Sequence, residues 1–283
     1  MIVTVALLRA ALTIAAAHDW NDPLPVMVSC NSNSWARPLA SAIRFGHFKT
    51  VESDDHDVPV GRLTRNPSDG PLVAALTIAE PDHDPSDEDI AKAPTDVQLA
   101  ANLRYAELIN PAMPVVIPTE RIADDVDLYA PLDPAMDYGY YNPDGKHHSG
   151  VWGHEPIDGL TVHVLWPLPA RHATTPPTPI RPVDWLARLH QTETWTGWHG
   201  RTHRIRDLEF YDNCMARAWL EINAATITEG VIRHLASHPD PDTVLDGPGE
   251  RTRLQEADIA LIDPRAWIAE SPLARALADV YAN

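Results

Sequence analysis

The chain contains little cysteine, little glycine and no apolar run long enough to cross a bilayer. Two cysteines in 283 residues cannot form a disulfide framework. Thirteen glycines without a three-residue period exclude a collagen-like structure. The longest apolar stretch, residues 2–17, falls short of the roughly 20 residues that a spanning helix needs, and Arg9 interrupts it.

Acidic residues outnumber basic ones by 40 to 22, which gives a formal charge of −18. This charge argues against a protein whose main surface contacts nucleic acid phosphates. The acidic residues cluster in residues 52–57, 80–89 and 124–127, which we interpret as solvated loops. With 44% hydrophobic residues the chain can bury a core, so we expect a soluble, globular protein.

A proline-rich segment, residues 173–182, divides the sequence. Proline lacks an N–H donor and fixes φ, so this segment cannot sustain a helix or a central strand. We therefore predict an α+β protein. Its parts are a mixed α/β domain over residues 1–172, the linker 173–182 and a helical domain over residues 183–283.

The first part alternates short apolar runs with helical patterns. In residues 2–17 the apolar side chains recur at helical spacing, so we interpret this stretch as a core helix or strand rather than a signal peptide. A helix is predicted over residues 95–109, because Thr95 and Gln98 have the spacing of a capping box. Three short apolar runs are predicted strands: residues 26–29, 71–78 and 113–117.

Another helix is predicted over residues 33–45, because Asn33 or Ser34 offers an acceptor to the free N–H groups at its start. The alternation of strands and helices favours a small, partly parallel sheet. Residues 133–166 differ, since they are dense in turn residues and end in an alternating apolar pattern. This stretch is a predicted β-hairpin region.

The second part carries helical spacing throughout. Its strongest pattern predicts one helix over residues 207–237, about 45 Å long. Shorter helices are predicted over residues 184–190, 250–262 and 272–281.

The first candidate site is Cys30, which lies between a predicted strand and a predicted helix. The dipole and free N–H groups at a helix start lower the pKa of a thiol and bind anions. With Asn33, Arg37, Pro38 and Ala40, Cys30 resembles the phosphate loop of low-molecular-weight tyrosine phosphatases, which implies a catalytic thiol and arginine. That family has one residue fewer between the two. The alternative is that Cys30 is a small buried hydrophobe that closes a strand.

The second candidate is a histidine group in the turn-rich region. Imidazoles near carboxylates bind zinc or a similar divalent metal. The spacing matches no established zinc motif, and histidines at surface turns need no ligand, so we expect no cofactor and keep zinc as the alternative. The four histidines are His147, His148, His154 and His163.

The third candidate is a basic, aromatic segment, residues 194–206, in an otherwise acidic chain. Arginine and tryptophan bind phosphate, a base or an acidic partner through charge and stacking. They bind the acidic loops of this chain, or of a second copy, equally well, and we favour this interpretation because it needs no ligand. The predicted binding residues are Trp198, His199, Arg201, His203, Arg204 and Arg206.

Two hypotheses follow. The first is a non-catalytic structural or protein-interaction subunit of a larger assembly, encoded by a phage or mobile element of a GC-rich bacterium and located in the cytoplasm or the virion. It rests on the absence of Walker A, GxGxxG and GxSxG patterns and on the basic segment. The alternative is a metal- or thiol-dependent hydrolase with a site near Cys30 or the His147 to His163 group.

Overall fold

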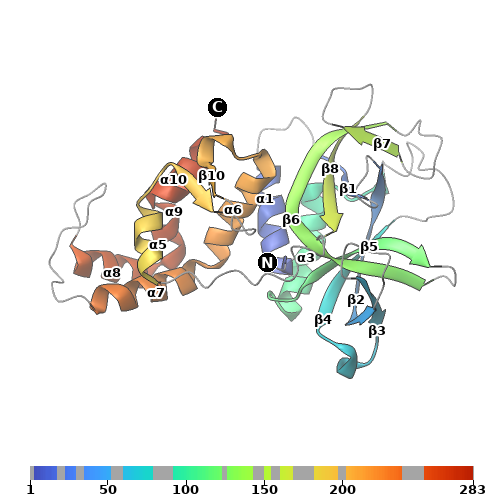
Figure 1. Cartoon of the computed structure of the whole chain (residues 1–283), viewed down its shortest axis with the longest axis horizontal. Coiled ribbons are helices and arrows are strands. Elements are labelled where there is room, and N and C mark those ends of the chain that lie inside the picture. The colour runs from blue at the N-terminus through green and yellow to red at the C-terminus, as the bar shows by residue number, and fades with distance from the viewer. Residues whose placement is uncertain are drawn as a thin grey trace. The chain divides into compact units, whose positions relative to one another are not determined.

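The computed structural model describes most of the helices and strands of this chain. The described residues are 3–17, 23–29, 35–51, 60–78, 92–122, 126–142, 150–153, 160–167, 182–196, 202–237 and 252–282. They form helices and a mixed sheet, which confirms the α+β class (Figure 1). The chain divides into two units, Met1–Pro176 and Pro177–Asn283, and the division falls within the proline-rich segment.

The described residues of the first unit include an eight-stranded sheet and two helices. The helices are α1 (Val5–Ala16) and α3 (Asp96–Ile109). The strands are β1 (Val26–Ser29), β2 (Trp35–Val51), β3 (Val60–Thr64), β4 (Leu72–Ile78), β5 (Val115–Ile122), β6 (Val126–Asn142), β7 (Gly150–Gly153) and β8 (Leu160–Pro167). The predicted strands over 26–29, 71–78 and 113–117 are therefore confirmed, the last one extending further than expected.

Strand pairing closes two rings that share β2 and β6. One ring contains β6, β3, β2, β4 and β5, and the other contains β1, β2, β7, β6 and β8. Register shifts between Ala40 and Ile43 and between Leu132 and Met136 interrupt the two shared strands. Such irregularities bend a strand, which lets one strand serve both rings. The pairs β1–β8 and β4–β5 are parallel and the others are antiparallel, so the sheet is partly parallel as predicted.

The predicted helix over residues 33–45 is wrong, because residues 35–51 form β2. β2 pairs with four strands: β1, β3, β4 and β7. β4 and β7 are the more distant of these partners in sequence, and the ladder hydrogen bonds and packing of all four strands outweigh the weak local preference for a helix. Asn33 and Ser34, the expected caps, lie outside the described residues.

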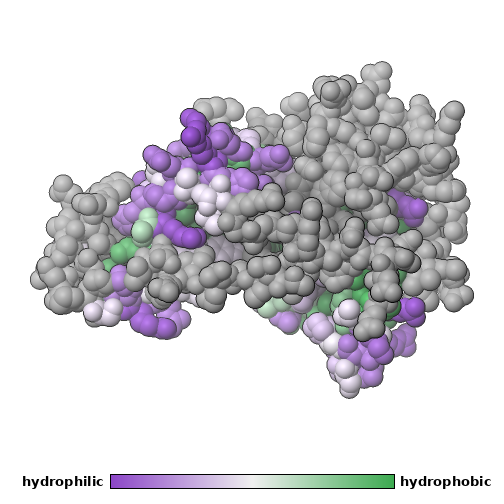
Figure 2. Space-filling view, in the orientation of Figure 1, coloured by the Kyte–Doolittle hydropathy of each residue, from purple (hydrophilic) through white to green (hydrophobic). Residues whose placement is uncertain are grey.

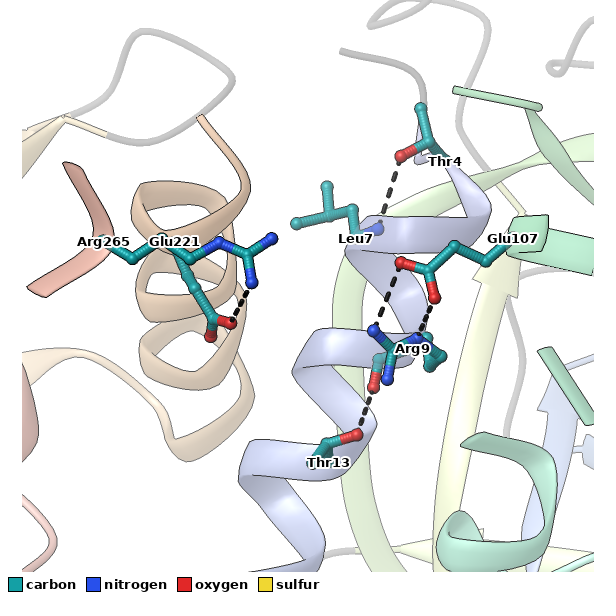
Figure 3. Close-up of polar contacts among 7 residues, drawn as sticks. All are labelled: Thr4, Leu7, Arg9, Thr13, Glu107, Glu221 and Arg265. Atoms are coloured by element: carbon teal, nitrogen blue, oxygen red, sulfur yellow. Dashed lines mark hydrogen bonds and ion pairs between the residues drawn. The ribbon is translucent and has the colours of Figure 1, made fainter. Parts of the chain in front are cut away.

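The helix α1 lies in the core of the first unit and packs against α3. Leu8, Ala11, Leu12 and Ala15 are fully buried, which matches the helical spacing of the sequence. The half-buried Arg9 guanidinium contacts Glu107 of α3 through two nitrogens, with Nε 2.5 Å from Oε2 and Nη2 3.2 Å from Oε1 (Figure 3). This paired geometry lets a charged side chain stay in a largely apolar helix.

The helix α3 begins with the predicted capping box. The Thr95 hydroxyl accepts from the Gln98 backbone N–H at 3.3 Å, and the Gln98 side chain accepts from the Thr95 N–H at 3.1 Å. Together these bonds satisfy two N–H groups that the helix leaves free. Leu99, Leu103 and Ala106 face the core.

A tight turn joins β3 to β4 and depends on one glycine. Asn66 caps a short 3-10 helix (Pro67–Asp69), and Gly70 follows with φ of 152°. A Cβ atom on Gly70 would lie 2.1 Å from the carbonyl oxygen of Phe48 on β2. Because L-residues rarely adopt this φ and the space is closed, the position requires glycine.

The second unit is mainly helical. Its elements are α5 (Pro182–Leu189), β9 (Thr194–Thr196), β10 (Thr202–Arg204), a 3-10 turn (Ile205–Asp207), α6 (Phe210–Ile222), α7 (Ala224–Ala236), α8 (Arg253–Ile262), α9 (Pro264–Ala269) and α10 (Pro272–Asp279). The predicted helices over 184–190, 250–262 and 272–281 correspond to α5, α8 and α10 and are confirmed. The short helix α9 was not predicted.

The prediction of one helix over residues 207–237 is wrong, because α6 and α7 are separate helices. Asn223 ends α6 with φ of −91° and ψ of 6°, and its side-chain amide donates to the Trp219 carbonyl at 2.8 Å. An asparagine side chain that bonds to the backbone competes with helical hydrogen bonds, which favours a break. Both helices still bury Leu220, Ile227 and Val231 in the same core.

The turn-rich residues 133–166 form the predicted antiparallel region. β6 pairs with β8 through a register that includes Tyr138 opposite His163 and Tyr140 opposite Thr161. β6 also pairs with β7, where Tyr141 lies opposite Trp152. The hairpin prediction is confirmed, although β6 begins earlier than residue 133.

Candidate functional site

The predicted binding segment forms a two-stranded hairpin in the second unit. β9 and β10 pair antiparallel, with His203 opposite Trp195 and Arg204 opposite Thr194. His203, Arg204 and Arg206 are therefore described, whereas Trp198, His199 and Arg201 lie outside the described residues. The hairpin holds the described basic residues close together in space as well as in sequence.

Two apolar side chains fix the hairpin to the core of the second unit. Trp195 is buried and packs edge-on against Trp219 at 6.3 Å between ring centroids, and Trp219 stacks on Trp185 at 5.3 Å. Ile205 is also buried, and its N–H donates to the Glu193 carbonyl at 2.9 Å. Aromatic clusters of this kind add to the energy of burial. The backbone that carries the basic residues is thus anchored at both ends.

A glutamine side chain further orders the entry to β9. The Gln191 Oε1 accepts from the N–H groups of Glu193 at 2.9 Å and Thr194 at 2.8 Å, and its Nε2 donates to the Thr194 carbonyl. The hydroxyls of Thr196 and Thr202 lie 3.0 Å apart across the strand pair. These bonds hold the turn without using the basic side chains.

The basic side chains themselves point to solvent. His203, Arg204 and Arg206 are all exposed. The Arg206 Nε lies 3.6 Å from the Asp207 Oδ1. Both side chains are more than half exposed, so this ion pair contributes little stability. Within the part of the chain that the structure describes, Arg204 has no ion-pair partner. Its guanidinium group is available to a carboxylate on another surface.

The structure corrects the expected position of Arg37. Arg37 lies on β2 opposite Val28 of β1, not one turn into a helix. Cys30, which follows β1, lies outside the described residues. The segment therefore runs from strand to strand, whereas a phosphate loop of the phosphatase type leads from a strand into a helix, so the resemblance has no support from the backbone on either side of Cys30.

Only one member of the histidine group lies on a described element. His163 is on β8, opposite Tyr138 of β6 and Val26 of β1. His147, His148 and His154 lie outside the described residues. Among the residues that the structure describes, no group of three or more His, Cys, Asp or Glu side chains is placed to hold a metal ion.

The second cysteine, Cys214, is buried in α6. Burial raises the pKa of its thiol from 9.0 to about 12, and the nearby Arg217 charge opposes this shift only weakly. The thiolate is the nucleophilic form of cysteine, so this side chain is unreactive at neutral pH. Its role is to fill space in the helical core.

Sequence reasoning missed an apolar surface on α3. Val97, Tyr105, Leu108 and Ile109 are exposed, and Phe45 of β2 contacts Tyr105 edge-on with 6.4 Å between ring centroids. In Figure 2 hydrophobic atoms reach the surface around α3 and the adjoining strands of the first unit. The sequence contained a signal for this surface, because α3 has apolar residues on two faces. A helix that packs with one face on a core needs only one apolar stripe.

The described helices include none that is long and apolar enough to cross a membrane. No protein-family model, no curated protein and no solved structure matches the chain.

Proposed function

We propose that the chain is a non-catalytic structural or protein-interaction subunit of a larger assembly. The observation that carries this proposal is the β9–β10 hairpin, whose exposed basic side chains sit on an ordered backbone. The chain as a whole is strongly acidic, with a net charge of −18. An acidic surface of a second copy is the partner that this arrangement fits.

The anchored hairpin favours binding because less freedom is lost when a partner arrives. Trp195 and Ile205 hold the backbone in the core, so only the side chains of Arg204 and Arg206 need to be ordered. Arginine presents a planar fork that binds a carboxylate through two parallel hydrogen bonds. Charge of this kind also steers association between acidic and basic surfaces.

Reversal of the hairpin charge tests this proposal. We expect the wild-type chain to sediment as a species larger than a monomer at low salt, and to dissociate as salt screens the contact. The double variant Arg204→Glu/Arg206→Glu should lose this contact and sediment as a smaller species than the wild type under the same conditions. The variant Arg204→Lys/Arg206→Lys is the matched control, because it keeps the charge. An unchanged sedimentation coefficient in the Glu variant contradicts the proposal.

One observation bears on the alternative, a metal- or thiol-dependent hydrolase. Ser29 of β1 and Gly150 of β7 both lie opposite Ala36 of β2, on its two sides. Adjacent strands are about 4.8 Å apart, so these two positions are roughly 10 Å apart. Cys30 follows Ser29 directly, and His148 precedes Gly150 by two positions. Cys30 and His148 themselves lie outside the described residues, so the alternative remains a prediction.

Metal analysis and a thiol variant test this alternative. Stoichiometric zinc in untagged protein, lost in His148→Ala, favours a metal site. Turnover of an aryl phosphate ester that disappears in Cys30→Ser favours a thiol mechanism. Protein that contains no stoichiometric metal and has no Cys30-dependent turnover excludes both forms of the alternative.

A further inference from the structure

Exposed large hydrophobic side chains gather in two places. In the part of the chain that the structure describes, all of them belong either to the α3 patch or to the end of α8. The α3 patch consists of Phe45, Val97, Tyr105, Leu108 and Ile109, and the α8 end consists of Leu261 and Ile262. Contiguous exposed apolar surface is rare on monomers and marks interaction sites.

The α3 patch follows the exposed side of α3 in the first unit. Val97, Tyr105 and Leu108 follow helical spacing on the side of α3 opposite the buried Leu99 and Leu103. Leu108 is 80% exposed and Tyr105 is 67% exposed. Over Val97 to Ile109 the stripe is about 18 Å long, and Phe45 widens it through its contact with Tyr105.

The α8 end is a smaller apolar projection on the second unit. Leu261 is 64% exposed and Ile262 is 84% exposed, and the helix stops directly after them at Asp263. Asp258 precedes them by three and four positions, so its carboxylate lies on the same face of α8 and is exposed. The two aliphatic side chains and the nearby carboxylate are complementary to a surface that has an apolar stripe and a cation beside it.

The α3 patch supplies that cation. Arg104 is exposed and lies four positions before Leu108, so it borders the stripe. The acidic residues of α3 are not available to oppose it, because Asp96 is buried and Glu107 pairs with Arg9. Among the described residues, the side chains of Arg104 and Asp258 have no ion-pair or hydrogen-bond partner. Within the described parts of the chain, the two apolar surfaces thus carry unpaired charges of opposite sign.

From this complementarity we infer that the α3 patch of one copy binds the α8 end of a second copy, which joins the chains head to tail. A two-fold contact between two α3 patches is less favourable, because it brings the like charges of two Arg104 side chains to the same apolar contact. A contact between two different surfaces of the same chain is heterologous, and it builds rings or open filaments. This contact is separate from the β9–β10 hairpin and does not depend on it.

Two single variants each remove one side of the contact. Leu108→Asp places a charge in the α3 patch, and Ile262→Asp places one in the α8 end; both residues are exposed, so both variants should fold. Ala225→Asp on α7, which is also exposed, is the matched control. All chains carry Arg204→Glu/Arg206→Glu, so that failure of the hairpin proposal is measured separately. Circular dichroism verifies folding, and sedimentation velocity over a range of concentrations gives the mass.

We expect the parent and the Ala225→Asp chain to associate as concentration rises. Leu108→Asp and Ile262→Asp should each weaken association about ten- to hundredfold and sediment as monomers. An equimolar mixture of the two should form a one-to-one dimer that grows no further. In that dimer the intact α8 end of the first variant binds the intact α3 patch of the second.

Three results overturn the inference. The first is a parent chain that remains a monomer at every concentration. The second is continued association of Ile262→Asp alone, which indicates that α3 binds α3. The third is a mixture of the two variants that stays monomeric.

A charge exchange tests the pairing of Arg104 with Asp258. Arg104→Asp and Asp258→Arg should each weaken association, and a chain that carries both should recover it. If the double variant is as weak as the single variants, the two side chains do not face each other and the proposed orientation is wrong.

Discussion

The first unit builds its core between strands that are far apart in sequence, whereas the second packs helices that follow one another along the chain. In the first unit β2 pairs with β1, β3, β4 and β7, so its position depends on four separate segments. In the second unit one cluster draws on the successive helices α5 to α10 and the β9–β10 hairpin. The stability of the two units therefore depends on different features. In the first unit it depends on backbone register, and in the second on a few large side chains.

Removal of the hairpin tryptophan should have the largest effect. Trp195→Ala removes the ring that contacts Trp219 and leaves a cavity in the second unit, so we expect a loss of about 3–5 kcal/mol in the free energy of unfolding. Chemical denaturation measures the loss, and hydrogen exchange should locate it in α5 and α7. Thr196→Ala on the same strand is the control. A loss below about 1 kcal/mol would show that the tryptophan cluster is not the main support.

A single methyl group in the β3–β4 turn tests the dependence of the first unit on backbone register. Gly70→Ala forces a Cβ against the Phe48 carbonyl at a φ of 152°, so we expect a loss of roughly 1–3 kcal/mol. Faster hydrogen exchange should appear in β2 and β4. Ser68→Ala in the same turn should have little effect, because its side chain is exposed. Equal losses in the two variants would contradict the explanation.

Each unit contains a helix that begins with a threonine capping box, which allows a direct comparison. Thr95 caps α3 in the first unit and Thr252 caps α8 in the second, and each hydroxyl accepts an N–H at 3.3 Å. We expect Thr95→Ala and Thr252→Ala to lose about 1 kcal/mol each, as measured by denaturant unfolding. Thr→Ser at each position keeps the acceptor and should retain most of the stability. Clearly unequal losses would show that tertiary packing changes the strength of the cap.

The buried thiol should have the smallest effect at neutral pH and a larger one in alkali. Burial raises the pKa of Cys214 to about 12, so above its ordinary value of 9.0 only the unfolded chain loses the proton. Its contribution to stability is therefore complete below pH 9 and decreases between pH 9 and 12. Unfolding measured across this range should show a steeper decrease in the wild type than in Cys214→Ala. Parallel curves would contradict the burial of the thiol.

Local signals in the sequence predicted several elements with their ends. The capping box at Thr95 and Gln98 gave the start of α3, because its two hydrogen bonds form within one turn of the helix. Residues 2–17 were expected to form a core helix or strand, and the spacing of Leu8, Ala11, Leu12 and Ala15 matches the buried face of α1. Both features depend only on residues a few positions apart.

The errors arose where distant contacts decide the local structure. Residues 35–51 carried signals for a helix, yet they are a strand because four other strands supply ladder partners. The break at Asn223 was missed because asparagine within a helix pattern carries only a small penalty. The basic segment 194–206 was found from composition, but its anchoring by Trp195 and Ile205 was not.

The net charge, the positions of most helices and the proline-rich segment could be predicted from the sequence, because these features depend on neighbouring residues. Three other features depend on contacts between segments: β2 and β6 belong to two rings of strands, Cys214 is buried, and an apolar stripe of α3 faces solvent. Burial and strand register each require two segments of the chain to contact one another. A side chain's surroundings are therefore set by residues that the local pattern does not contain.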